Sequence, residues 1–206
     1  MRVWGDQYSR DLQRYTLAWR MLRLEARTQT IAAWSGLPKF RIQTLNRSHG
    51  GTGSAKAAIR HRGPSPYSVG YFLRSAHLRA EGAALVAMFQ AFDLLPERAL
   101  RNPARDLPSV ARGERLCDAF ELYRSLIPES TVLLEHVVML LAAVAQESEL
   151  IVTRCLYCEG VMLADRYGEQ AKICPCCSEA GIRVPWAARN VDASQSAGGV
   201  SAPVAR

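Results

Sequence analysis

One segment determines how this 206-residue chain is organised. It reads Arg154-Cys-Leu-Tyr-Cys-Glu-Gly-Val-Met-Leu-Ala-Asp-Arg-Tyr-Gly-Glu-Gln-Ala-Lys-Ile-Cys-Pro-Cys-Cys177. Five of the six cysteines of the protein lie within these 24 residues. A cysteine cluster of this density serves as a redox centre, as a set of disulfide bonds or as a metal site. The spacing of the thiols and the character of the rest of the chain separate these three chemistries.

Two Cys-x-x-Cys pairs favour a metal site. Cys155 and Cys158 form the first pair, Cys174 and Cys177 form the second, and fifteen residues separate the pairs. Each pair can fold into a knuckle with both thiolates on one side, and two knuckles together supply the tetrahedral sulfur set that Zn²⁺ favours. We therefore expect one structural Zn²⁺ bound by these four cysteines. Cys176 is then a bystander, although a Cys-x-Cys pairing of Cys174 with Cys176 is a competing ligand set.

The other sulfur chemistries fit the segment less well. A thioredoxin-like redox site uses one Cys-x-x-Cys in a βαβ setting, and iron–sulfur clusters usually have tighter cysteine spacings. A catalytic zinc ion keeps an open position beside His or carboxylate ligands, and the segment contains no His. Residues Met1 to Gln13 lack the apolar core of a signal peptide, so we expect a cytoplasmic protein, in which disulfides are rare.

The chain before this segment has the periodicity of helices. An amphipathic helix is predicted from apolar residues at alternating spacings of three and four, which are Leu12, Tyr15, Trp19, Leu22 and Ala26. Further helices are expected from Tyr67 through Leu95, over about Val110–Leu126 and over Thr131–Gln146. A loop is expected at 46–66, and irregular proline-rich chain at 96–108.

The most hydrophobic stretch, Thr131–Ala145, is interrupted by Glu135 and His136. It is also shorter than the roughly 20 apolar residues that span a bilayer, so we expect a buried core helix and no membrane association. His136 is then a hydrogen-bonded core histidine. Cys117, on the apolar face of the preceding helix, is expected to be a small buried hydrophobe.

Residues 28–47 fit the template of a helix-turn-helix, which packs two short helices across a tight turn. Ala32 is the small residue on the first helix, and Gly36 is a turn residue that tolerates positive φ. The apolar anchors are Ile31, Leu37, Ile42 and Leu45, and Pro38 suits the first position of the second helix. The outward face, expected to contact DNA, carries Lys39, Arg41, Gln43, Thr44 and Arg47.

The net charge of +7 at pH 7 is concentrated near this motif. Residues 1–62 contain twelve Lys or Arg against three Asp or Glu, whereas residues 63–206 contain fourteen against sixteen. A basic third that holds a helix-turn-helix favours contact with nucleic acid. Further candidates for phosphate contacts lie in the loop, at Lys56, Arg60, His61 and Arg62.

We expect that the protein is not an enzyme and has no small-molecule substrate. The four histidines are scattered along the chain, at positions 49, 61, 77 and 136, and form no nucleophile–base pair. Gly50-Gly-Thr-Gly53 lacks the Lys-Ser/Thr that a phosphate-binding P-loop requires.

The combination of these elements resembles the FlhC family, the zinc-containing subunits of the bacterial FlhD–FlhC flagellar master activator. The resemblance covers roughly residues 10–185 and rests on the order of four parts. These are a helix running into Glu25-Ala-Arg-Thr-Gln29, the helix-turn-helix, the Gly63-Pro-Ser-Pro-Tyr-Ser-Val-Gly-Tyr-Phe72 segment and the paired Cys-x-x-Cys. At Val69-Gly-Tyr-Phe72 the chain departs from the Thr-Asp-Trp-Phe-like run usual in the family, as a divergent member would.

The resemblance implies a transcriptional activator of flagellar operons, acting in a hetero-oligomer with an FlhD-like protein. Its implied partners are double-stranded promoter DNA and RNA polymerase. By position, the implied ligands of one structural Zn²⁺ are Cys155, Cys158, Cys174 and Cys177. Two alternatives stay open: a paralogue that regulates non-flagellar genes, and a zinc-stabilised protein-interaction adaptor.

The predicted fold class is mainly α. A helical domain with the helix-turn-helix is expected at 1–150, and a small four-cysteine zinc-knuckle module at 151–185. The remaining residues, 186–206, are rich in Ala, Ser and Gly and are expected to form a disordered tail.

Overall fold

The computed structural model describes residues 3–50, 68–95, 108–147, 149–168 and 171–181. These residues are mainly helical, and a small cysteine-containing unit follows the helices, as the sequence predicts. The helices are α1 (Val3–Arg23), α2 (Thr28–Ser35), α3 (Lys39–Gly50), α4 (Ala76–Ala91), α5 (Val110–Leu126), α6 (Leu134–Gln146) and α7 (Pro175–Glu179), with a 3₁₀ turn η1 (Val69–Leu73). The strands are β1 (Leu150–Arg154) and β2 (Val161–Asp165).

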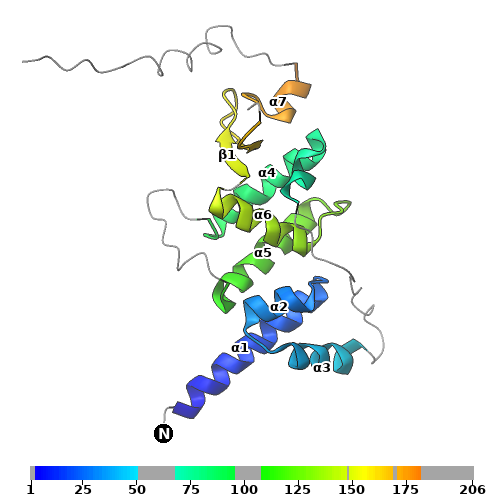
Figure 1. Ribbon diagram of the computed structural model, residues 1–206, viewed down its shortest axis with the longest axis vertical. Helices are drawn as coiled ribbons and strands as arrows, with labels where there is room; N and C mark the ends of the chain where they lie inside the picture. Colours follow the sequence, from blue (N-terminus) through cyan, green and yellow to red (C-terminus); the bar gives the residue numbers. More distant parts are fainter. Residues whose placement is uncertain (1–2, 51–67, 96–107, 148, 169–170, 182–206) are drawn as a thin grey trace, which may run out of the picture.

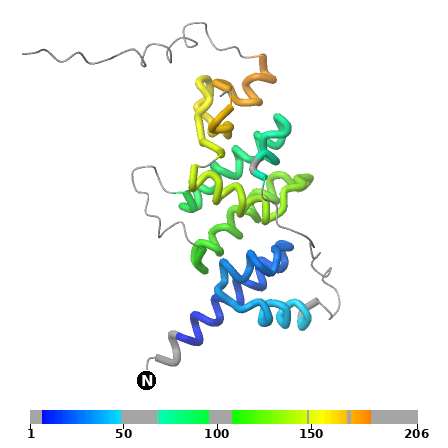
Figure 2. Tube along the Cα trace, viewed as in Figure 1, coloured from blue at the N-terminus to red at the C-terminus, as the bar shows by residue number. Residues whose placement is uncertain are grey.

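The elements form three tiers along the long axis of the molecule (Figures 1 and 2). The lower tier consists of α1, α2 and α3, and the middle tier of α4, α5 and α6. The upper tier consists of the hairpin β1–β2 and α7. The hairpin is antiparallel and pairs Leu150 with Asp165 and Arg154 with Val161. Within the described residues, no helix has both the length and the hydrophobicity needed to cross a bilayer.

One hydrophobic core connects the tiers, and two glycines let neighbouring elements approach closely. A Cβ on Gly113 of α5 would lie 2.6 Å from the Leu17 side chain of α1. A Cβ on Gly82 of α4 would lie 2.5 Å from the Leu163 side chain of β2. Leu17 and Leu163 belong to the same buried cluster. The two glycines therefore mark the contacts of the middle tier with the lower and the upper tier.

The buried face of α1 differs from the predicted one. The side chains of Leu17, Ala18 and Met21 are fully buried. Leu12 is 55% exposed and Trp19 is 36% exposed, although both lie on the predicted apolar face. The prediction was wrong because α5 packs on the Leu17 side of the helix, and the first turns of α1 extend beyond the other helices (Figure 1).

Several predicted boundaries also shift. Residues 46–50 continue α3, so the expected loop does not begin at Asn46. The helix expected from Tyr67 is divided into η1 and α4, because Ser75 caps a new helix by accepting a hydrogen bond from the Leu78 N–H. The helix expected from Thr131 begins at Leu134. The Val110–Leu126 boundaries are confirmed, with Ser109 as the N-cap.

The predictions for individual core residues are confirmed at two positions. Cys117 is fully buried in α5, where burial raises the pKa of its thiol to about 12. The ring of His136 stacks on Tyr71 with 4.2 Å between ring centroids, and its Nδ1 accepts a hydrogen bond from the Leu133 N–H. The basic loop residues Lys56, Arg60, His61 and Arg62, the proline-rich region 96–107 and the tail lie outside the described residues.

Candidate metal centre and basic surface

The four cysteines of the two Cys-x-x-Cys pairs come together at the upper tier. Cys155 follows β1 directly, and Cys158 lies in the turn before β2. Cys174 is the N-cap of α7, with Pro175 after it, and Cys177 lies one turn into that helix. The four sulfur atoms all lie within 4.8 Å of one another.

The sulfur geometry fits a zinc ion. The Sγ atoms of Cys158 and Cys174 are 3.8 Å apart. Four sulfurs arranged tetrahedrally at the usual Zn–S distance of about 2.3 Å lie about 3.8 Å from one another. The donor set, the distances and the burial of Cys155, Cys174 and Cys177 together are those of a closed structural metal site.

Backbone N–H groups aim at the sulfur atoms. The Cys174 N–H donates to Sγ of Cys155 and the Cys177 N–H donates to Sγ of Cys174, both at 3.3 Å. Burial raises the pKa of Cys155, but hydrogen bonds from the backbone of Cys158, Cys174 and Tyr157 outweigh it and lower that pKa to about 6. These backbone hydrogen bonds favour the thiolate, which is the form that binds a metal.

The pKa of Cys177 shifts in the opposite direction from that of Cys155. Its hydrogen bond with Cys174 and its burial raise the pKa of Cys177 above the usual range of a thiol. Thiolates packed this closely repel one another, so all four can be ionised together only when a cation neutralises them. A divalent ion would therefore take the place of the remaining thiol protons.

The fifth sulfur of the segment points elsewhere. Cys177 belongs to the group of four sulfurs and is buried, whereas Cys176 is exposed and outside that group. The structure thus brings together the four predicted ligands and leaves Cys176 out. In the first knuckle, Glu159 has a positive φ of +56°.

The helices α2 and α3 meet across a short turn at the lower tier. Gly36 has φ of +69°, and the Leu37 N–H donates to the Ser35 hydroxyl. Ile31, Leu37 and Ile42 are buried and Leu45 is half-buried, so the predicted apolar anchors do face the core. The carbonyl of Pro38 accepts from the Arg41 N–H, so Pro38 directly precedes α3 and does not occupy its first position.

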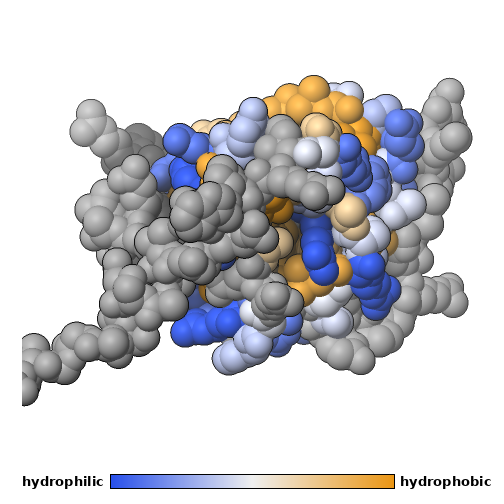
Figure 3. Space-filling model, turned by 90° about the horizontal axis from the view of Figure 1, so that it is seen from above, coloured by the Kyte–Doolittle hydropathy of each residue, from blue (hydrophilic) through white to orange (hydrophobic). Residues whose placement is uncertain are grey.

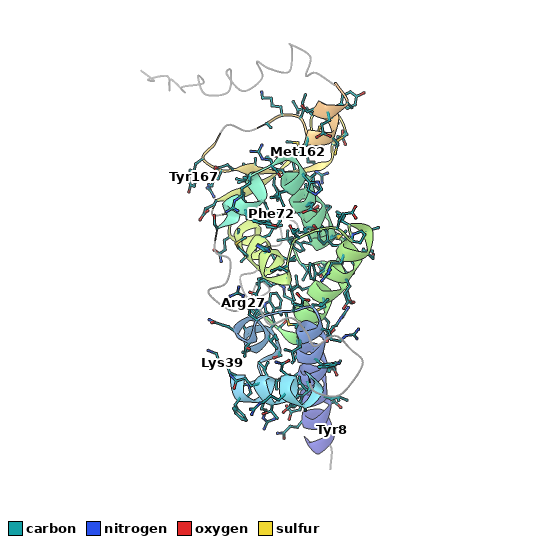
Figure 4. The ribbon with its side chains drawn as sticks, turned by 90° about the vertical axis from the view of Figure 1, so that its right-hand side faces the viewer. Tyr8, Arg27, Lys39, Phe72, Met162 and Tyr167 are labelled. Carbon is teal, nitrogen blue, oxygen red and sulfur yellow. The ribbon has the colours of Figure 1, made fainter. Side chains whose placement is uncertain are left out.

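All five residues predicted to contact DNA are exposed on α3. These are Lys39, Arg41, Gln43, Thr44 and Arg47. Lys39 lies at the periphery of the lower tier in Figure 4. Lys39, Gln43 and Arg47 follow one another at helical spacings of four and form one row.

Arg41 differs from the rest of this set because it is already bound within the chain. Its guanidinium donates to the Tyr15 hydroxyl at 2.9 Å and lies 6.0 Å from the centre of that ring. This contact ties α3 to α1. We therefore assign Arg41 to positioning α3, with the outward row left for a ligand.

The charged side chains within the stretch that contains α2 and α3 are all basic. Between Ala26 and Arg62 the sequence contains seven Lys or Arg and no Asp or Glu. Within the described part of that stretch, no carboxylate of the same helices is available to neutralise Lys39 or Arg47. A surface of this kind attracts a polyanion.

Glu135 of α6 fixes the start of α2. Its carboxylate accepts hydrogen bonds from the Arg27 N–H and from the Thr30 hydroxyl, both at 2.8 Å. The N-cap residue of α2 is Arg27, whose side chain makes no capping hydrogen bond, so a carboxylate from another tier satisfies the helix terminus. The sequence signal was a single carboxylate in a long apolar run, but nothing in that run identified its partner.

Arg20 of α1 ties the lower tier to α5. Its guanidinium bonds to Glu114, Asp118 and Glu121, at distances between 2.6 and 3.0 Å. The three acids follow one another at spacings of four and three, so they line one face of α5. Arg20 and Glu135 together hold the basic helices in a defined position on the middle tier.

The chain matches no protein-family model, and no curated protein matches it significantly.

Proposed function

We propose that the protein is a zinc-stabilised DNA-binding subunit of a transcriptional activator. The observation that carries this proposal is the row of Lys39, Gln43 and Arg47 on α3. These side chains are exposed, lie in a stretch of sequence without Asp or Glu, and belong to a short helix packed across a tight turn. A helix of this kind can enter a major groove, where amide and cationic side chains bond base edges and phosphates.

In this proposal the two candidate sites have different roles. The row on α3 contacts DNA, with phosphate contacts fixing the register and Gln43 and Lys39 reading bases. One Zn²⁺ bound by Cys155, Cys158, Cys174 and Cys177 holds the upper tier together, since a unit of this size buries little apolar surface of its own. The zinc ion has no catalytic part in this function.

The resemblance to FlhC supports the biological setting of the proposal. In that setting the chain acts in the cytoplasm with an FlhD-like protein, binds promoters of flagellar operons and recruits RNA polymerase. A paralogue that controls other genes would use the same surface on α3.

A salt titration of DNA binding tests the proposal. The zinc-loaded protein is mixed with fluorescently labelled promoter duplex, with and without an FlhD-like protein, and anisotropy is followed from about 50 to 200 mM salt. We expect the logarithm of the affinity to fall linearly with the logarithm of the salt concentration, because phosphate contacts release counterions. Absence of binding under both conditions would overturn the proposal.

The double substitution Lys39→Ala and Gln43→Ala is expected to weaken specific binding by about 2–4 kcal/mol, since each base contact contributes roughly 1–3 kcal/mol. The matched control is Arg124→Ala, which removes an exposed cation from α5. Circular dichroism checks that both variants keep their helices. Unchanged specific binding in the double variant would show that α3 does not read the DNA.

A protein-interaction adaptor is the second candidate, and one observation favours it. The first knuckle exposes Leu156 and Tyr157, and the turn after β2 exposes Tyr167. Exposed apolar and aromatic side chains are typical of protein-binding surfaces. The adaptor is favoured if partner binding persists while DNA binding is absent at every salt concentration.

A further inference from the structure

A groove of about 650 Å³ separates α4 from the cysteine module. One wall is a face of α4 made of small side chains, which are Ala76, Ala80, Ala83, Ala84 and Ala87. The facing wall comes from β2 and the second knuckle, with Met162, Ile173 and Cys176. The groove thus lies between two structural units, where ligand sites are common, and its volume falls in the usual range of roughly 300–1,000 Å³.

The alanines explain why the space exists. Gly82 brings β2 close to α4, and the neighbouring alanines, each with a single methyl group, leave space beside the second knuckle. From Ala76 to Ala87 the helix rises by about 17 Å, so the groove extends along about three turns of α4. An elongated apolar group fits this shape better than a compact one.

The charges of the groove are positive at one end. Arg74 and Arg79 line it at the start of α4, where the helix N-terminus adds partial positive charge. Arg74 lies 5.7 Å from the centre of the Tyr71 ring, and Nε of Arg79 donates to the Leu73 carbonyl. These contacts hold both guanidiniums at the groove, and among the described residues that line it none is Asp or Glu. Figure 3 views the molecule from above, onto the upper tier, and shows hydrophobic surface beside strongly hydrophilic side chains.

We propose that this groove binds a small amphipathic anion, with its anionic head at Arg74 and Arg79 and its apolar body along the alanines of α4. The residues after α7 do not suit the groove as an occupant, because residues 182–206 carry three Arg against one Asp. A carboxylate or sulfonate head group pairs with guanidinium through charge-assisted hydrogen bonds. Cys158 and Cys174 also form part of the wall, so the ligand links the metal module to α4.

The inference is tested with decanoate and, as an uncharged control of the same chain length, decanol. Calorimetric titration of the full zinc-loaded chain, without DNA, measures both. We expect one decanoate per chain and at least tenfold weaker binding of decanol, because only decanoate pairs with the arginines. Equal affinities for the two, or no binding of decanoate, would overturn the inference.

Two substitutions locate the ligand. Ala83→Trp fills the groove and should abolish decanoate binding, whereas Ala91→Trp, at the end of the same helix and outside the groove, should leave it unchanged. Arg79→Gln should weaken decanoate about tenfold and leave decanol unchanged, with Arg124→Gln as the control. Binding that survives both Ala83→Trp and Arg79→Gln would place the ligand elsewhere and refute the assignment.

Cys176 provides a readout that does not depend on any substitution. It is exposed at the groove and is not one of the four clustered cysteines, so N-ethylmaleimide should modify it in the zinc-loaded protein. Saturating decanoate should slow this modification several-fold, as followed by peptide mass spectrometry. An unchanged rate would contradict the inference and would leave the DNA-binding proposal unaffected.

Discussion

The lower tier and the cysteine module attach to the same middle tier by different means. The helices α1–α3 contribute large apolar side chains to the common core. In addition, Arg20 of α1 pairs with acids of α5, and Glu135 of α6 accepts hydrogen bonds from the start of α2. The cysteine module has a separate buried cluster that consists of three of its four candidate ligands, Cys155, Cys174 and Cys177, together with Met162. One end of the molecule therefore depends on side-chain packing and, in our proposal, the other end depends on a metal ion.

The two modes of attachment place different limits on substitutions in the lower tier and in the cysteine module. The DNA contact that we propose for α3 needs this helix in one orientation. A buried carboxylate holds it through α2, and the Arg41–Tyr15 contact ties it to α1. In our proposals the module is held by its metal and by Leu150 and Leu163 in the common core, which leaves its outer residues and the groove available for binding.

Cys155→Ser or Cys174→Ser should release the metal and unfold the module while the helices persist. Loss of one thiolate from a four-cysteine site removes most of the affinity that folds so small a unit. Metal content by mass spectrometry and hydrogen exchange over residues 150–181 measure the effect. Cys176→Ser is the matched control and should retain one metal per chain. Loss of metal in that control would favour Cys174 and Cys176 as the second pair of ligands.

Glu135→Ala should lower the free energy of unfolding of the lower tier by about 2–4 kcal/mol, because two hydrogen bonds to a buried carboxylate are lost. Urea titration followed by tryptophan fluorescence is suitable, since Trp19 and Trp34 lie in α1 and α2. Glu129→Ala, at an exposed position, should change nothing measurable. Equal stability of the two variants would mean that α2 is positioned by packing alone.

Gly113→Ala and Gly82→Ala should each cost about 1–3 kcal/mol, because the added methyl group collides with a buried leucine. The two variants should differ in what they disturb. Gly82→Ala should speed zinc transfer to a chelator, and Gly113→Ala should lower the urea midpoint reported by tryptophan. Each variant is the control for the other. Identical profiles would show that the tiers unfold as one unit.

The smallest effect concerns pH and Cys117. Burial raises the pKa of this thiol from 9.0 to about 12, so the unfolded chain releases the proton first as pH rises. Stability should be unaffected by this group below pH 9 and should fall by about 1.4 kcal/mol per pH unit above it. Urea midpoints between pH 8 and 10 measure the slope, which Cys117→Ala should reduce. An unchanged slope would show that other groups dominate.

Local features of the sequence were predicted well where local chemistry determines them. Cys155, Cys158, Cys174 and Cys177 were recognised because two knuckles impose a spacing that is visible in the chain. Gly36 was recognised because only a residue that tolerates positive φ fits that turn. The helix Val110–Leu126 was recognised because Ser109 and the apolar period mark it.

Features that join distant segments were not predicted. Helical period identified an apolar face on α1 but not which side α5 would cover, so Leu12 and Trp19 were placed wrongly. Glu135 looked like an interruption of a core helix, since its partners lie more than a hundred residues away in the chain. Arg20 gave no signal, because its three acids lie on another helix.

The sequence alone predicted most of the helices, the tight turn after α2 and the four-cysteine cluster, because each depends on residues close together in the chain. Only the tertiary structure decided which face of α1 is buried, that Glu135 caps α2, and that Cys176 borders a groove with Arg74 and Arg79. The physical reason is that packing, burial and long-range ion pairs are properties of surfaces brought together by folding. Local periodicity and spacing do not indicate which surface becomes the packing partner.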